Sequence, residues 1–232
     1  MMAHHEQIQI LRIERLKARQ YLIMADDGQS FTIHEDLLVR FGLSKGKLLS
    51  REQIEQLLSE NSAHAAYRLA LRFIGIRQRS AREVRKKLTE KQYTTAIIDQ
   101  VIAKLTGQGF LNDRAYAENV SEQRMLVQKK GRRWVANELR QKGVGNALIQ
   151  EALNKIDAES EYRAALLLAE KKWRMSSGDN RKKAEKTAGF LLRRGYSGSI
   201  VARALREIRG SMSENDDDGL TEEAFTDMFP ED

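Results

Sequence analysis

The sequence predicts a mainly α-helical protein in which three tandem three-helix repeats form an elongated, curved array. Three observations support this fold class. The 232 residues include one proline, Pro230, so no proline interrupts a helix in the preceding sequence. Apolar residues recur with helical spacing between about residues 64 and 210. A pattern within this stretch also repeats at intervals of 51 and 52 residues, beginning at Leu88, Leu139 and Leu191.

Residues 1–63 differ from the repeats and predict a small β-hairpin module with short helices. Two β-prone runs, residues 21–25 and 29–33, flank an Asp-Asp-Gly turn that ends at Gly28, which is a strong hairpin signal. Residues 8–16 are expected to add a third antiparallel strand. We interpret this module as a packing or partner-docking appendage.

Two short helices are expected after the hairpin. Residues 35–41 precede Gly42, a natural helix terminator. Ser50 starts the second helix, because Ser50 and Gln53 have the spacing of a capping box.

Residues 64–111, 112–156 and 157–210 are the three predicted repeats, and each should contain three helices. In the first repeat, Ser80 and Glu83 have capping-box spacing at the start of the middle helix, which in the second repeat is predicted over residues 132–141. The first helix of the second repeat is expected to carry its apolar residues at Tyr116, Val120 and Val127. Recurring positions after the leucines are Lys91, Lys142 and Arg194; Gln92, Gly143 and Gly195; and Tyr93, Val144 and Tyr196.

The charge of the chain is unevenly distributed. The formal net charge is +7, yet residues 213–232 contain nine acidic residues and no Lys or Arg. The remainder carries 40 basic against 24 acidic residues, a net charge of +16. We therefore predict an acidic, disordered tail over residues 211–232 and a basic body that binds a polyanion, most economically nucleic acid.

No catalytic or metal-binding pattern emerges from the sequence. The chain has no cysteine, which excludes disulfides and thiolate chemistry. No glycine-rich phosphate loop or membrane-length apolar run is present. None of the four histidines has the spacing of a metal pair; they are His4, His5, His34 and His64. We expect a cytoplasmic, monomeric non-enzyme without cofactor, metal or membrane contact.

Basic residues cluster in corresponding regions of the three repeats and predict a binding face. The candidate residues are Arg82, Arg85, Lys86, Lys87, Lys129, Lys130, Arg132, Arg133, Arg140, Lys142, Arg181, Lys182, Lys183, Arg193 and Arg194. The alternative interpretation is that they are solvated helix faces. In particular, the recurring Lys91, Lys142 and Arg194 would then be cations that favour helix C-termini.

Three motifs, in this order and spacing, resemble the RecX family over about residues 65–208. They are Ser80-x-x-Glu83-Val84-x-x-Lys87-Leu88, then Gly109-Phe110-Leu111-Asn112-Asp113-x-x-Tyr116-Ala117, then Lys130-Gly131-x-x-x-Val135-x-x-Glu138-Leu139-x-x-Lys142-Gly143-Val144. The chain departs from the family at Gln92, where glycine is frequent, and the third repeat matches least.

This resemblance implies a regulator that binds the RecA recombinase, especially its filament on single-stranded DNA, and limits filament extension, ATP hydrolysis and strand exchange. It also implies DNA binding with little sequence preference, and roles in DNA repair, homologous recombination and the SOS response. Two alternatives remain at this point. Three-helix units also occur in helix-turn-helix transcriptional regulators, and a helical repeat also serves as a scaffold for another protein.

Overall fold

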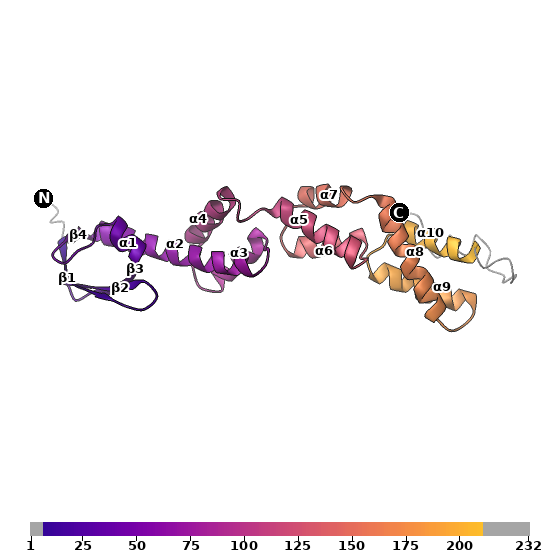
Figure 1. Cartoon of the computed structure of the whole chain (residues 1–232), viewed down its shortest axis with the longest axis horizontal. Coiled ribbons are helices and arrows are strands. Elements are labelled where there is room, and N and C mark those ends of the chain that lie inside the picture. The colour runs from indigo at the N-terminus through magenta and orange to yellow at the C-terminus, as the bar shows by residue number, and fades with distance from the viewer. Residues whose placement is uncertain (1–6, 211–232) are drawn as a thin grey trace. The chain divides into compact units, whose positions relative to one another are not determined.

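The computed structural model in Figure 1 describes residues 7–210, and the acidic tail predicted for residues 211–232 lies outside the described residues. Within residues 7–210 the chain folds into ten α-helices, one π-helical turn and one four-stranded sheet. The described residues divide into two compact units, 7–77 with 84–111 and 78–83 with 112–210. The prediction of a mainly α-helical chain with a small N-terminal β module is confirmed.

The sheet contains the predicted hairpin and one strand that the sequence did not indicate. Its order is β3-β2-β1-β4, and each neighbouring pair is antiparallel. Gly28 has φ +81° in the turn between β2 and β3, which explains the Asp-Gly signal. The missed strand has three residues and is too short to show alternation. The strands are β1 (Gln7–Arg15), β2 (Gln20–Ala25), β3 (Ser30–His34) and β4 (Leu48–Ser50).

Two helices pack beside this sheet. The first, α1 (Glu35–Arg40), forms as expected. The second, α2 (Arg51–Ile76), begins at the predicted Ser50–Gln53 capping box but is one continuous helix of 26 residues. The expectation of a short helix here was wrong, because residues 51–74 contain neither glycine nor proline, and no second N-cap interrupts the helix.

Together with α2, which is the first helix of the first repeat, the remaining helices form the three predicted sets of three. The middle helix of the second repeat has the predicted bounds, residues 132–141. No helix among residues 7–210 is both long and apolar enough to span a membrane. The helices are α3 (Ala81–Thr89), α4 (Thr95–Gly107), α5 (Asp113–Glu122), α6 (Arg132–Gln141), α7 (Asn146–Asn154), α8 (Ala158–Met175), α9 (Asn180–Arg193) and α10 (Gly198–Gly210).

Positions that recur in the sequence have the same structural role in each repeat. Leu88, Leu139 and Leu191 are completely buried. Gly143 and Gly195 follow the middle helices with φ +79° and +88°, and these values are typical of the left-handed residue that ends a helix. The chain keeps the same conformation at Gln92, with φ +62°. The register therefore requires a left-handed residue here, which explains why glycine is the better fit.

A π-helical turn, η1 (Gln123–Val127), follows α5 and changes one predicted core position. Val127 is 74% exposed, whereas Met125 is 3% exposed and packs in the core of the second repeat. The prediction of Val127 as a core residue was wrong because a π-turn adds residues to the turn and shifts the buried face. A prediction based on the α-helical period of 3.6 residues does not detect such a shift.

Candidate functional site

The middle helices of the second and third repeats meet end to end. The backbone N–H of Gly131 donates to the Arg194 carbonyl at 2.9 Å, and the Arg133 N–H donates to the Gly195 carbonyl at 3.1 Å. The two backbones approach so closely that a Cβ on Gly131 would lie 2.2 Å from the Gly195 oxygen. Glycine at both positions permits this contact.

Residues 78–83 form an equivalent junction with the end of α6, inside the same compact unit. The Ser80 hydroxyl donates to the Lys142 carbonyl at 2.6 Å. A Cβ on Gly143 would lie 2.1 Å from Cδ of Arg82, so the Arg82 stem covers this glycine. The recurring pairs Lys142–Gly143 and Arg194–Gly195 therefore mark these two junctions within the second unit.

Carboxylates from the next repeat complete both junctions. Oδ1 of Asp113, the first residue of α5, accepts from the Ala81 N–H at 2.9 Å. Glu161 of α8 has the same role one repeat later, since its Oε1 accepts from the Arg132 N–H at 2.9 Å. The first N–H groups of a helix have no partner within that helix, and these contacts satisfy them. Asp113 belongs to the motif that resembles the RecX family, and its hydrogen bond to the Ala81 N–H gives this residue a physical role.

Three of the predicted binding residues are held by these junctions. Arg132 donates to Glu161 Oε2 at 2.6 Å and to the carbonyls of Leu153 and Ile156. Lys142 Nζ donates to Glu83 at 3.2 Å. The Arg194 guanidinium donates to the carbonyls of Gln128 and Lys129 at 2.7 and 3.3 Å. The structure therefore assigns Arg132, Lys142 and Arg194 to contacts between repeats.

Two other groups stiffen the segment before α6. The buried Tyr196 hydroxyl donates to the Lys129 carbonyl at 2.8 Å, and burial raises the pKa of Tyr196 to about 12. Arg124 forms a two-point ion pair with Glu138 at 2.8 and 2.9 Å, which raises the pKa of Arg124 above its usual value. Lys129 and the neighbouring Lys130 are thus presented by a fixed segment.

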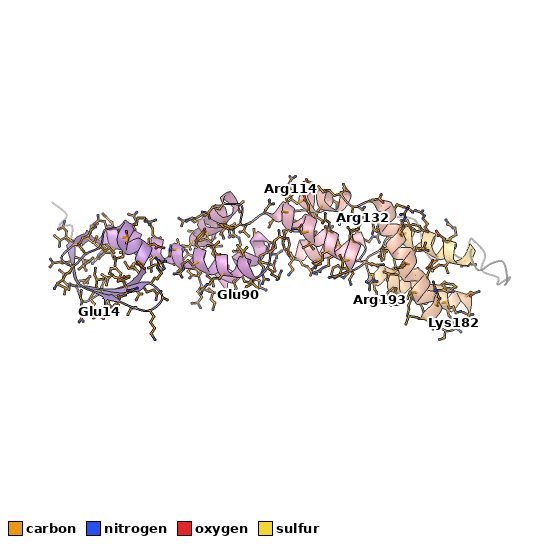
Figure 2. All side chains as sticks on the ribbon, viewed as in Figure 1. Glu14, Glu90, Arg114, Arg132, Lys182 and Arg193 are labelled. Carbon is orange, nitrogen blue, oxygen red and sulfur yellow. The ribbon has the colours of Figure 1, made fainter. Side chains whose placement is uncertain are left out.

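A basic cleft lies on α6, and we call it the α6 cleft. Its polar lining includes Arg133, Asn137 and Arg140, which share one helix face at i, i+4 and i+7, together with Gln150 of α7. The cavity measures about 360 Å³, and Arg132 and Leu153 also line it. Figure 2 marks Arg132 at the start of this helix.

Hydrogen bonds to two asparagines orient Arg140 in the α6 cleft. Arg140 donates to Oδ1 of Asn137 at 2.8 Å and to Oδ1 of Asn146 at 3.2 Å. Both partners are neutral amides, so they orient the guanidinium without cancelling its charge. Paired guanidinium groups and amide donors in a concave site suit the oxygens of a phosphate or a carboxylate.

A cation also lies over an aromatic ring of α6. Lys130 Nζ is 4.3 Å from the centroid of the Trp134 ring. This is within the range of a cation–π interaction, which holds the half-buried lysine in place.

The other predicted residues lie on exposed or half-buried helix faces. On α3, Arg85 pairs with Asp99 at 2.5 Å and Lys87 with Glu90 at 3.7 Å. The remaining ones are Lys86 on α3 and Arg181, Lys182, Lys183 and Arg193 on α9; Lys182 and Arg193 are marked in Figure 2.

Of the candidates, the structure brings Arg132, Arg133 and Arg140 together at one cleft. The sequence interpretation missed the neutral residues Asn137 and Gln150. Asn137 could have been predicted, because it lies four residues after Arg133 and so on the same helix face. Gln150 lies on another helix, and no local pattern connects it to this face.

Comparison with known proteins matches all three repeats. Models of the first, second and third three-helix domains of RecX match residues 66–105, 112–153 and 159–205. The regulatory protein RecX of Halalkalibacterium halodurans is 31% identical over 206 residues, which cover 86% of this chain and 77% of that protein. The regulatory protein RecX of Clostridium acetobutylicum is 31% identical over 210 residues, covering 88% of this chain and 97% of that protein.

Solved structures agree with these sequence matches. A crystal structure of regulatory protein RecX has a TM-score of 0.68 at 28% identity, covering 83% of this chain and 96% of that one. RecX from Lactobacillus salivarius has a TM-score of 0.61 at 26% identity, covering 65% of this chain and 98% of that one.

Proposed function

The chain belongs to the RecX family, and on that premise we propose that it is a non-catalytic regulator that binds the RecA recombinase and its filament on single-stranded DNA. Bound there, it inhibits filament extension, ATP hydrolysis and strand exchange. The observation that carries this proposal is the α6 cleft, where Arg133 and Arg140 lie on one helix face beside amide donors. This arrangement suits DNA phosphates or acidic side chains of RecA.

The junctions between repeats support a steric and conformational mode of action. Within the second unit, backbone hydrogen bonds fix α6 relative to α9, Glu161 holds the start of α6, and Asp113 holds residues 78–83. A rigid ligand shifts a filament between two states only by its difference in affinity for them. We therefore infer that the protein binds more tightly to a filament state that neither extends nor completes the ATPase cycle.

The proposal is tested by RecA's DNA-dependent ATPase, measured with and without this protein. The test variant is the double charge reversal Arg133→Glu with Arg140→Glu in the α6 cleft. The matched control reverses two α8 arginines, Arg163→Glu with Arg174→Glu, whose side chains are 79% and 74% exposed and pair with Glu159 and Glu170 on the same helix. Both double variants change the net charge by the same amount.

We expect the α6 variant to require at least tenfold more protein for half-maximal inhibition, and the α8 control to require less than threefold more. Filament affinity of the native protein should fall steeply with salt, and the α6 variant should show a shallower dependence. Equal losses in the two variants, or an affinity independent of salt, would overturn the role of the cleft. Lack of any effect of the native protein on the ATPase would overturn the proposed function.

A further inference from the structure

Three side chains that can ligate a metal meet where the sheet joins the helices of the first unit. His34 ends β3, Asp36 lies in the first turn of α1, and His64 lies on α2. His34 Nδ1 is 3.2 Å from Asp36 Oδ2, and His64 Nε2 is 3.3 Å from the same oxygen. The two imidazole rings are 4.5 Å apart between centroids. One carboxylate oxygen thus lies against both histidines.

The contacts of His34 leave room for a positive centre in this cluster. Asp36 Oδ2 lies 3.2 Å from His34 Nδ1, and either a proton or a metal ion between these two atoms satisfies both. The backbone N–H of Asp36 also lies 3.3 Å from this nitrogen, which is a long and therefore weak hydrogen bond. A metal ion bound at Nδ1 would therefore compete with one weak contact.

Ligand spacing identifies the kind of cation. A tetrahedral ion with bonds of about 2.0–2.1 Å places its ligand atoms about 3.3–3.4 Å apart. Two of the three separations, 3.2 and 3.3 Å, are close to this value, and all three ligand atoms lie within 4.8 Å of one another. Two imidazoles and one carboxylate suit zinc-type ions and not Mg²⁺ or Ca²⁺. We propose that His34, Asp36 and His64 bind one divalent transition-metal ion, for which Zn²⁺ is the representative.

Asn61 connects the segments that carry the cluster. Asn61 of α2 accepts from the His34 backbone N–H at 3.2 Å and donates to the Thr32 carbonyl at 2.9 Å, which holds α2 against β3. The His34 side chain is 7% exposed and Asp36 56%, so the site has a buried base and an open side. Within the described part of the chain, the buried His34 Nε2 has no hydrogen-bond partner, so the polar contacts of this ring are those of Nδ1 with Asp36.

A metal here would connect the sheet and α1 to the middle of α2. Three protein ligands leave a fourth tetrahedral position for water. Because binding requires the folded arrangement of residues far apart in sequence, the ion would stabilise the first unit against unfolding.

The experiment uses the full chain without an affinity tag and titrates it with CoCl₂ and ZnCl₂. Tetrahedral Co²⁺ has intense visible absorption, and calorimetry with Zn²⁺ gives stoichiometry and affinity. The test variants are Asp36→Asn and His64→Ala, which alter exposed or partly exposed side chains and spare buried His34. Because His4 and His5 also bind metals in principle, the matched control is His4→Ala with His5→Ala.

We expect one equivalent of metal, tetrahedral Co²⁺ absorption and a higher Tm in the native chain and in the His4/His5 control. Each test variant should bind at least tenfold more weakly and lose the Co²⁺ signal while keeping its far-ultraviolet circular dichroism. The proposal is overturned if the native chain shows no saturable binding, if both test variants bind like the native chain, or if the His4/His5 control abolishes binding.

Discussion

The junction between α6 and α9 predicts a large penalty for adding one methyl group at Gly131. This residue has φ −77° and ψ 160°, a conformation open to any L-amino acid, so alanine meets no backbone restriction. Its Cβ, however, would lie 2.2 Å from the Gly195 oxygen and 2.4 Å from the Tyr196 nitrogen. Both contacts are with backbone, which cannot rotate away as a side chain can.

The magnitude follows from the contacts that must open. Overpacking costs about 1–3 kcal/mol, and each of the two weakened backbone hydrogen bonds contributes about 0.5–1.5 kcal/mol. We expect Gly131→Ala to lower the free energy of unfolding by about 2–6 kcal/mol. For a chain of this size, the loss corresponds to a decrease in Tm of roughly 4–24 °C.

Gly145 provides the matched control. It is the N-cap of α7 with φ −67° and ψ 144°, and a Cβ there meets no atom within 4 Å. Since both glycines precede a helix in similar conformations, capping and chain-entropy effects cancel in the comparison. Gly145→Ala should change the unfolding free energy by less than about 1 kcal/mol.

Urea unfolding followed by tryptophan fluorescence measures both variants, because Trp134 and Trp173 report on the second unit. A lower midpoint for Gly131→Ala and a near-native midpoint for Gly145→Ala would support the junction. Equal losses in the two variants would refute the close backbone approach as the cause.

Three further predictions concern charge. Glu161→Gln should lower the free energy of unfolding by about 2–4 kcal/mol, because the partly buried guanidinium of Arg132 loses its counter-ion. Glu185→Gln, in an exposed ion pair of α9, should cost less than about 0.5 kcal/mol, and equal urea midpoints for the two variants would contradict this prediction. Hydrogen bonding from the Ser160 backbone N–H lowers the pKa of Asp157 below 3.8, so its contribution to stability is complete above about pH 4 and is lost as the pH falls through the native pKa. An NMR titration giving an unshifted pKa would disprove this. Finally, removing residues 213–232 should tighten DNA binding at low salt, since the acidic segment competes with phosphates through its high effective concentration; unchanged affinity would exclude such competition.

Local features of the fold were predictable because they depend on residues close in sequence. The capping boxes at Ser50 and Ser80 and the hairpin turn at Gly28 formed as expected. The length of α2 and the π-turn that exposes Val127 were not predicted. In both cases, local spacing could not show how a segment continues or shifts when it packs against its neighbours.

The sequence by itself determined the repeat register, the positions of the core leucines and a basic body. Each of these properties depends on residue type and spacing alone. Only the tertiary structure decided which basic residues serve the fold, because Arg132, Lys142 and Arg194 bond to carboxylates and backbone carbonyls far away in the chain. It also brought His34 and His64 to one carboxylate. Such roles depend on distances between distant segments, and those distances exist only after the helices have packed.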